Sequence, residues 1–192
     1  MIYIIRHGQT ALNNARALQG RSNHPINEAG EQQARELGEW FHTQGIRFDA
    51  VFSSPLQRAV QTAKLAAGEV PIRVDERLIE MDYGPYEGMD LRNPAPEVMA
   101  FFRDFVHAPA PEGMEPLHEV VERTGRFMET LRGENEKNIL ISTHAIAMKG
   151  ILEYLTPDSR GSYWSKYIGN CAVYVTSLQE DGFAVPKELV RW

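Results

Sequence analysis

The sequence predicts an α/β protein in which helices cover both faces of a mostly parallel sheet. Short segments rich in β-branched residues alternate with longer segments whose apolar residues recur at helical spacing. The segments 1–6 and 138–142 are mostly apolar along their length, as expected for strands buried on both faces of a parallel sheet. Strands that alternate with helices in this way form a three-layer α/β/α sandwich.

The first predicted strand is 1–6, and the first predicted helix runs from Asn27 to Thr43. Asn27 suits the N-cap position, because its side chain can accept a hydrogen bond from the first turn. Glu28 and Glu31 fall in that turn, where the helix dipole favours acidic side chains. Apolar residues then recur at helical spacing until a glycine ends the helix.

The second predicted strand, 49–53, is followed by a strong signal for the start of a helix. Ser54 stands in the N-cap position, Pro55 in the first helical position and Gln57 in the third. This is the pattern of a capping box, in which two side chains satisfy the free N–H groups of the first turn. A short strand at 71–74 is expected after this helix.

Residues 77–114 are less regular, because glycines and prolines interrupt them. Within them, the apolar residues between Val98 and Phe105 have the spacing of a short helix. We expect a single domain over 1–192, with 89–115 as a small cap or insertion. The later elements are predicted helices at 116–132 and 145–155, and predicted strands at 138–142, 170–178 and 183–190.

The composition limits the classes of function. The net charge of −6 and the pI near 5.5 argue against a nucleic-acid-binding surface and favour a small ligand in a local basic pocket. Cys171 is the single cysteine, so no internal disulfide can form, and its apolar surroundings predict a buried thiol. No apolar run has membrane-spanning length, and no signal-peptide pattern precedes Arg6. We therefore expect a cytoplasmic protein without a membrane or nucleic-acid partner.

A cation, an imidazole and a glycine stand where the first strand ends. Open α/β sheets bind ligands at the carboxyl ends of their strands, and Arg6-His7-Gly8 occupies this place. Gly8 lets the chain turn sharply and brings backbone N–H groups close to a bound group. The first acidic residue is Glu28, and the three charged residues before it are all arginines. This start predicts an anionic ligand at the tip of the first strand.

His144 repeats this context at the end of the strand 138–142. It precedes the last predicted helix, whose first N–H groups, beginning with that of Ala145, are expected to be free for an anion. Arg58 lies about one turn into the helix that Ser54 is predicted to cap. A cation there opposes the helix dipole, and a bound anion would explain its position.

These segments and those around them resemble the histidine phosphatase superfamily, which has the phosphoglycerate mutase-like fold. The matching motifs follow one another in order over residues 1 to 155, which makes the resemblance far more specific than Arg-His-Gly alone. The motifs are Arg6-His7-Gly8-Gln9-Thr10 with Asn13, Gln19-Gly20, Ser53-Ser54-Pro55-Leu56 with Arg58, Thr62-Ala63, Leu78 with Glu80, Glu87-Gly88 and Ser142-Thr143-His144.

The resemblance implies a role for each matching residue. His7 would be the nucleophile that becomes a phosphohistidine, and Glu80 would be the proton donor to the leaving oxygen and later the base for water. Arg6, Arg58 and His144 would hold the oxygens of the transferring phosphoryl group. The further residues that the resemblance places beside the substrate are Asn13, Gln19, Gly20 and Ala145.

Chemistry supports these roles independently, since phosphoryl transfer requires mainly positioning and charge neutralisation. Guanidinium groups match phosphate oxygens, and two of them with a second imidazole could replace a metal ion. His7 must be neutral at the attacking nitrogen, so its other nitrogen should donate to a fixed acceptor such as a backbone carbonyl. Glu80 must be protonated to act as an acid near neutral pH, and burial beside a bound phosphate would favour that form. Asp82 is a rival for this role.

Two positions depart from the family pattern. Ala145 stands where the family often has glycine after the second histidine, which would alter the approach of the backbone to phosphate. Tyr86 stands where tryptophan is common. No pair of the six histidines has metal-ligand spacing, and no nucleotide-binding phosphate loop is present, so no metal and no cofactor are expected.

Three functions remain open within this fold. The first is hydrolysis of phosphate monoesters on a small phosphorylated metabolite, the second is a cofactor-dependent phosphoglycerate mutase, and the third is a non-catalytic module that binds phosphorylated ligands. Mutases resemble longer chains with more cations in the middle insertion, whereas 89–115 contains only Arg92 and Arg103, which favours hydrolysis. Phe101, Phe102 and Phe105 would line the entrance or belong to the core. The physiological substrate is open, and a homodimer is compatible with the sequence.

Overall fold

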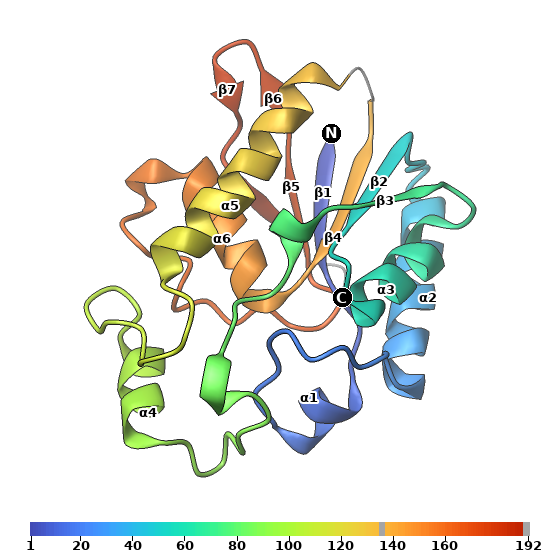
Figure 1. Ribbon diagram of the computed structural model, residues 1–192. Helices are drawn as coiled ribbons and strands as arrows, with labels where there is room; N and C mark the ends of the chain where they lie inside the picture. The colour runs from blue at the N-terminus through green and yellow to red at the C-terminus, as the bar shows by residue number, and fades with distance from the viewer. Residues whose placement is uncertain (135–136, 190–192) are drawn as a thin grey trace.

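The computed structural model describes residues 1–134 and 137–189, and it confirms the α/β fold (Figure 1). The strands of the main sheet are β1 (Ile2–Arg6), β2 (Ala50–Ser53), β3 (Ile72–Val74), β4 (Ile139–Thr143), β5 (Val173–Thr176) and β8 (Lys187–Leu189). Within the described residues their order is β3-β2-β4-β1-β5-β8. The pairs among β3, β2, β4 and β1 are parallel, and β5 and β8 join one edge antiparallel, so the sheet is mostly parallel as predicted.

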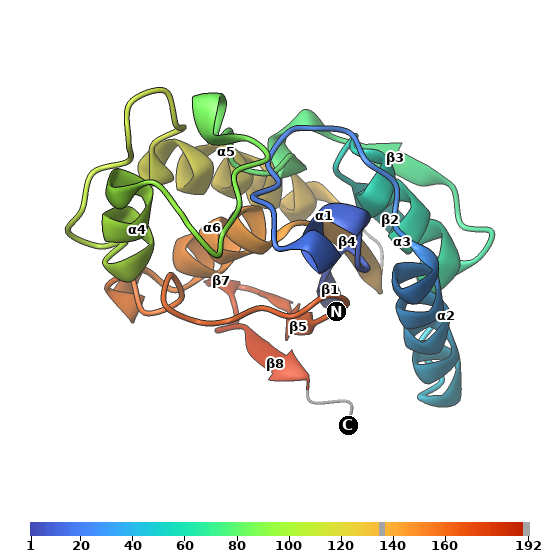
Figure 2. The ribbon, with the colours of Figure 1, turned by 90° about the horizontal axis from the view of Figure 1, so that it is seen from below.

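Helices cover both faces of this sheet (Figures 1 and 2). They are α2 (Glu28–Thr43) and α3 (Gln57–Ala67) on one face, and α5 (Leu117–Thr130) and α6 (Ala145–Leu155) on the other. Alternate residues of β1 enter two separate cores, because successive side chains of a strand point to opposite faces. Ile2 and Ile4 pack with residues of α5 and α6, whereas Tyr3 and Ile5 pack with residues of α2 and α3. The fold is therefore the predicted three-layer sandwich.

The register of the parallel strands brings three loops to one edge of the sheet. Arg6 pairs with Thr143 across β1 and β4, and Ser53 pairs with Ser142 across β2 and β4. The residues that follow these strands consequently leave the sheet side by side, at its lower edge in Figure 1. His7 and His144 come directly after β1 and β4, so the topology brings the two predicted site histidines to the same edge.

The two predicted helix starts had different outcomes. Asn27 caps α2 as predicted, since its side chain accepts a backbone N–H of the first turn. The capping box at Ser54 is wrong, because α3 begins only at Gln57; the hydroxyl of Ser54 accepts the N–H of Leu56 at 3.3 Å, before the helix, and contacts His144 at 2.7 Å. The N–H of Gln57 is satisfied by Asn23, whose Oδ1 accepts it at 2.8 Å. Asn23, from a loop distant in sequence, therefore caps α3 where the sequence predicted the neighbouring Ser54.

The end of the chain differs from the two predicted strands. The strand predicted at 170–178 begins only after Cys171, whose left-handed φ of 55° prevents extended pairing there. Cys171 is buried, as predicted. The strand predicted at 183–190 is interrupted near Pro186, which cannot donate to a ladder, and residue 190 lies outside the described residues. The two short strands of the hairpin at this end are β6 (Leu178–Gln179) and β7 (Gly182–Phe183).

Two small helices lie at the carboxyl edge of the sheet (Figure 2). The helix α1 (Ala11–Ala15) was not predicted, although Thr10 and Asn13 form a capping box at its start. The helix α4 (Pro96–Arg103) agrees within two residues with the short helix predicted from apolar spacing. It belongs to 89–115, and the action of this segment as a cap on a single domain stays a prediction.

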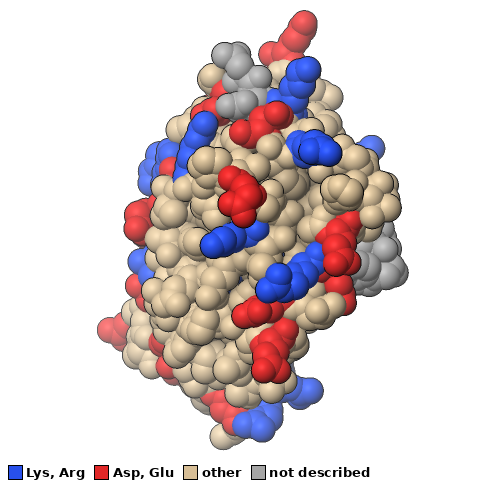
Figure 3. Space-filling model, turned by 90° about the vertical axis from the view of Figure 1, so that its right-hand side faces the viewer, with Lys and Arg blue, Asp and Glu red and all other residues tan. Residues whose placement is uncertain are grey.

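The outer face of α2 and α3 carries charges of both signs. Figure 3 shows Lys and Arg atoms interspersed with Asp and Glu atoms on this side, without a continuous basic surface. Among the described residues, no helix combines the length and the apolar character needed to cross a membrane.

The loop that carries His7 rests directly on the first turn of α2. A Cβ atom added to Gly30 would lie 2.1 Å from the carbonyl oxygen of Gln9, and one added to Gly8 would lie 2.5 Å from that of Gly30. Only two glycines allow the backbones to approach so closely. This contact fixes the loop after β1 against α2.

We expect Gly30→Ala to lower the free energy of unfolding by about 1–3 kcal/mol, because the new methyl group must displace the Gln9 backbone. Urea unfolding followed by circular dichroism measures this loss. Gly133→Ala is the matched control, since no atom lies within 4 Å of its added Cβ. Equal stability of the two variants would contradict the proposed close packing.

Candidate active site

His7 is buried at the tip of β1, with one ring nitrogen anchored. Its Nδ1 lies 2.7 Å from the carbonyl oxygen of Gly8. Because a carbonyl can only accept, Nδ1 carries the proton and Nε2 keeps its lone pair. The N–H of Gly8 is in turn held by Thr62 Oγ1 at 2.9 Å. The anchored Nδ1 that the chemistry required is therefore present, and Nε2 is the nitrogen that can act as a nucleophile.

The surroundings of His7 keep its ring neutral. Burial lowers the pKa of His7 well below 6.5, and the positive charges of Arg6 and Arg58 lower it further. The hydrogen bond to the Gly8 carbonyl acts in the opposite direction but does not reverse the shift. A lowered pKa means that the ring gains a proton only at pH values well below 6.5. His7 is accordingly neutral at neutral pH.

His144 lies beside His7, and other side chains occupy both of its nitrogens. The two ring centroids are 5.1 Å apart. Nδ1 of His144 accepts from Nε of Arg58 at 3.2 Å, which places the ring proton on Nε2, 2.7 Å from Ser54 Oγ. Burial lowers the pKa of His144 well below its ordinary value, with Arg58 as the next cause. His144 is thus a neutral ring held in one orientation.

Arg58 is fully buried and joins the site to the loop before α2. One terminal nitrogen donates to the carbonyl of Ser22 at 2.7 Å, and the other donates to the carbonyl of Gly20. Burial lowers the pKa of Arg58 to about 10, so the guanidinium is still charged at neutral pH. Gly20, predicted as a substrate-binding residue, is therefore placed as a partner of Arg58.

Two buried donors in this region have no partner among the described residues. Arg6 donates through Nη1 to the carbonyl of Ile168 at 2.5 Å, but its Nε has no acceptor. Gln19 accepts a hydrogen bond from Thr10 through Oε1, and its Nε2 is also without an acceptor. A buried donor without an acceptor costs free energy, so native proteins rarely leave one. Both residues were predicted to bind substrate, and an anion would satisfy both donors.

Glu80 occupies the start of α6, which the sequence had assigned to a bound anion. Its Oε1 accepts from the N–H groups of Met81 and Ala147 at 2.9 Å each, and its Oε2 accepts from that of Ile146 at 3.2 Å. The expectation of several free N–H groups is therefore wrong. Among the described residues, the helix start keeps only the N–H of Ala145 for a ligand.

The alternative acid, Asp82, points to different partners. Its carboxylate is about half exposed and contacts Arg21 at 3.4 Å and the N–H of Gly84 at 2.8 Å. Glu80 is only 3% exposed. The two carboxylates therefore have separate surroundings, although side chains two residues apart in a regular extended strand would share one face.

A buried ion pair fixes the segment around Glu80. Arg123 on α5 pairs with Glu115 at 2.7 Å, and both side chains are about nine-tenths buried. Another nitrogen of Arg123 donates to the carbonyls of Arg77 and Ile79, which precede Glu80. Glu115 also accepts the backbone N–H of Asp82. The pair therefore holds the backbone on both sides of Glu80.

Two residues of the site were missed in the sequence. Asn170 donates to the carbonyl of His7 at 3.0 Å and to Oδ1 of Asn13 at 3.3 Å, and thereby places Asn13 next to the nucleophile. No motif marks Asn170. Lys149 was missed too. It is a charged residue among the apolar residues of the first two turns of α6, and this contrast could have marked it as a candidate functional residue.

A cavity of about 300 Å³ lies at this edge of the sheet. Arg6 and Ala145, the neighbours of His7 and His144 in the chain, form part of its lining. Lys149 also lines it, together with the aromatic side chains of Phe102, Phe105 and Trp164. Phe102 and Phe105 also pack against the core cluster that contains Phe101, which is 1% exposed. That these phenylalanines form the entrance to the site stays a prediction.

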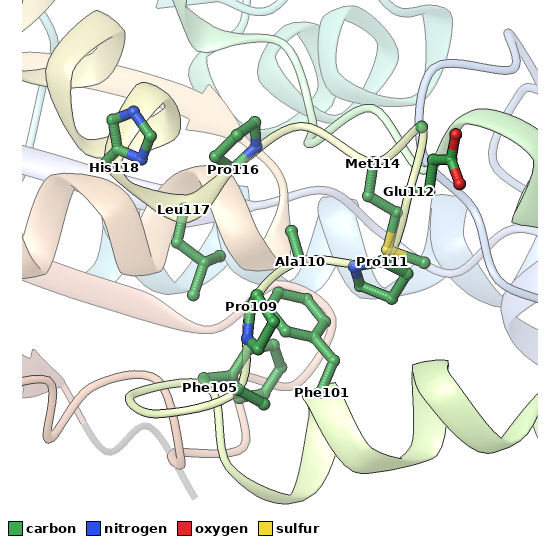
Figure 4. A pocket seen from close by; sticks show the side chains of 12 residues that line it. Phe101, Phe105, Pro109, Ala110, Pro111, Glu112, Met114, Pro116, Leu117 and His118 are labelled. Carbon is green, nitrogen blue, oxygen red and sulfur yellow. The ribbon is translucent and has the colours of Figure 1, made fainter.

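A larger cavity of about 500 Å³ lies between α4 and the start of α5 (Figure 4). Phe101, Phe105 and several prolines surround it, and Glu112 points away from it. Phe105 lines both cavities. Among the described residues, no three His, Cys, Asp or Glu side chains are arranged to hold a metal ion.

The site thus combines a neutral nitrogen nucleophile with the guanidiniums of the buried Arg58 and the partly buried Arg6, and with one buried carboxyl group. The guanidiniums can neutralise an anion with several oxygens, and the carboxyl group can carry a proton. This arrangement fits transfer of a phosphoryl group to nitrogen.

Comparisons with known proteins identify the family of the chain. The sequence model of the histidine phosphatase superfamily (branch 1) matches residues 2–188. The broad-specificity phosphatase YOR283W of Saccharomyces cerevisiae is 33% identical over 174 residues, covering 84% of this chain and 73% of that protein. The 2,3-bisphosphoglycerate-dependent phosphoglycerate mutase of Parvibaculum lavamentivorans is 28% identical over 205 residues, covering 99% and 96%. The solved structure of YhfR from Bacillus stearothermophilus superposes with a TM-score of 0.84 at 28% identity, covering 96% and 94%.

We expect Arg123→Met to lower the free energy of unfolding by about 3 kcal/mol, because it leaves the buried Glu115 carboxylate without its main partner. Arg126→Met on the same helix is the control, since its ion pair with Glu122 is exposed and screened by solvent. Urea denaturation of both variants measures the difference. If the two substitutions cost the same, the buried pair does not brace the Glu80 segment.

Proposed function

Because the chain belongs to the histidine phosphatase superfamily (branch 1), we propose that it hydrolyses small phosphate monoesters through a phosphohistidine at His7. The observation that carries this proposal is the neutral, anchored ring of His7, which lies in the field of the guanidiniums of Arg6 and Arg58. The unpartnered donors of Arg6 and Gln19 support it, because a phosphoryl group supplies the missing acceptors. The similarity to a phosphatase named for broad specificity supports a small-metabolite substrate.

In the first step, the lone pair on Nε2 of His7 attacks phosphorus, and the bond from phosphorus to the ester oxygen breaks. Glu80 gives its proton to that oxygen, so the product leaves as a neutral alcohol. Arg6 and Arg58 neutralise the charge on the phosphoryl oxygens during the transfer. In the second step, water attacks phosphorus, Glu80 takes the proton from this water, and the bond to Nε2 breaks. Inorganic phosphate is released and His7 is neutral again.

The hydrogen bonds of Glu80 indicate which of its oxygens carries the proton. Oε1 already accepts two backbone N–H groups, whereas Oε2 accepts one, from Ile146. Oε2 therefore has the free lone pair, and we assign the transferred proton to it.

His144 must change its protonation to contact the substrate. Its nitrogens are engaged by Arg58 and Ser54, and the positive charge of Arg58 contributes to its lowered pKa. A bound phosphate dianion opposes that charge and so favours protonation of Nδ1. His144 then donates through Nδ1 to the phosphoryl group, and Nε of Arg58 turns to the same group. Asn13, Gly20 and Ala145 complete the proposed substrate contacts.

The mutase alternative is kept, because one relative of similar identity is a phosphoglycerate mutase. A colorimetric assay with p-nitrophenyl phosphate distinguishes the two. Release of phosphate without bisphosphoglycerate supports the hydrolase, and interconversion of phosphoglycerates that depends on bisphosphoglycerate supports the mutase. Binding of phosphorylated ligands without either reaction would support the non-catalytic module.

We further propose that turnover needs no metal, so chelator should leave it intact. Cytoplasmic location and homodimer formation stay predictions.

We expect His7→Ala to abolish the labelled phosphoenzyme that forms from a ³²P-labelled ester. The N–P bond of phosphohistidine is labile to acid and stable to alkali, so alkaline quenching preserves the label and acid removes it. His42→Ala, which changes an exposed histidine on α2, should leave the label intact. An acid-stable label, or one that survives His7→Ala, would contradict the nucleophile assignment.

We expect Glu80→Gln to lower the rate of transfer from an alkyl phosphate about a hundredfold or more, because the amide cannot protonate the leaving oxygen. The effect on p-nitrophenyl phosphate should be much smaller, since its leaving group departs as an anion. Stopped-flow measurement of product release compares the two esters. Equal slowing of both would move the acid role elsewhere, with Asp82 tested first through Asp82→Asn.

A further inference from the structure

Lys149 is a buried cation that forms no ion pair with the described residues, although the Glu80 carboxylate raises its pKa from a distance. Its side chain is 8% exposed, and its Nζ donates to the carbonyl of Trp164 at 2.7 Å. Nζ also lies 5.3 Å from the centre of the Phe105 ring, within the range of a cation–π interaction. Among the described residues, no carboxylate lies within ion-pair distance of Nζ. Burial lowers the pKa of Lys149 to about 8, so the ammonium group is still largely protonated at neutral pH.

Burial of an unpaired ammonium group is unfavourable, which calls for an explanation by function. One carbonyl and one ring face satisfy only part of its three N–H donors. Lys149 lines the 300 Å³ cavity, where its remaining donors can meet a ligand. The missing partner is therefore most simply an anionic group of a molecule bound in that cavity.

The position of the cavity relates this anion to the proposed reaction. The same cavity is lined by Arg6, which precedes His7 in the chain, and by Ala145, which follows His144. A phosphate monoester whose phosphoryl group lies at His7 would accordingly place its leaving group here. The aromatic side chains of Phe102, Phe105 and Trp164 provide apolar contacts for a short carbon chain.

We propose that this cavity binds the leaving group, and that Lys149 recognises a carboxylate a few bonds from the ester oxygen. The substrates are then phosphate monoesters of small hydroxy acids. This inference rests on the proposed phosphatase function and narrows its substrate class.

A carboxylate fits this site better than a second phosphate. Lys149 is a single point charge that has already given one donor to a carbonyl, whereas phosphate recognition favours the fork of arginine. A volume of about 300 Å³ is at the small end of ligand pockets. Lys166, the other lysine of the lining, contacts the ring of Tyr163.

The cation of this cavity does not come from the segment 89–115, in which cations are scarce. Arg92 of this segment pairs with Asp90, so it is already neutralised. The cation at the cavity comes instead from α6, far from that segment in sequence.

The test compares matched pairs of esters that differ in the carboxylate. The pairs are 3-phosphoglycerate with glycerol 1-phosphate, and O-phosphoserine with O-phosphoethanolamine. For the unchanged protein, we expect kcat/KM for the ester that contains the carboxylate to be at least about tenfold higher than for the other member of its pair. Lys149→Met should reduce this preference by about tenfold or more, whereas Lys149→Arg should retain most of it. Lys64→Met, which changes an exposed lysine on α3, should leave the preference unchanged.

Each outcome decides the inference. Equal kcat/KM for both members of each pair in the unchanged protein would overturn it, as would an equal loss for acid and alcohol in Lys149→Met. If circular dichroism shows that Lys149→Met does not fold, the pair ratios of the unchanged protein and of Lys149→Arg decide in its place. Failure to hydrolyse every ester, p-nitrophenyl phosphate included, would overturn the proposed phosphatase function itself.

Discussion

The site depends on positive charge that stands around His7 before any ligand arrives. Arg58 is fully buried and Arg6 partly buried; burial of the two imidazoles lowers their pKa values, and the charges of these guanidiniums lower them further, so both rings are neutral. A neutral His7 is a nucleophile, and a desolvated guanidinium interacts strongly with an anion. The same burial that costs free energy in the empty site therefore supplies binding energy for a phosphoryl group. Other features of the edge, including the fixed ring of His144, follow from this charge.

The carboxyl group of the site, that of Glu80, also has a structural role in the fold. Glu80 caps the start of α6 by accepting the backbone N–H groups of Ile146 and Ala147, so the carboxyl group that would handle protons also stabilises a helix. Its backbone is held by Arg123 and Glu115, which lie in the layer behind it. The position of the proposed acid is thus set by structural contacts, and a substitution at Arg123 or Glu115 would affect the chemistry without touching the substrate.

The residues proposed to select the substrate lie apart from the residues proposed to react with it. The guanidiniums around His7 would act on the phosphoryl group shared by all esters, whereas the cavity with Lys149 would act on the leaving group alone. The aromatic side chains there provide contact without polarity, and the lysine adds one directed charge. A phosphatase can change its substrates by altering such a cavity while its reacting groups stay the same.

Local signals in the sequence determined the strands, the main helices and the motif residues, because hydrophobic period and strand-end motifs are properties of neighbouring residues. The register of β1 with β4, which joins His7 to His144, depends on contacts between distant segments and was implied only by the family resemblance. Capping of α3 by Asn23 could not be predicted, since its partner lies in a distant loop. Likewise, only the tertiary structure placed Glu80 at the start of α6 and Lys149 in the cavity. Burial and unpaired charge are properties of packing, and they decided which polar residues bear on function.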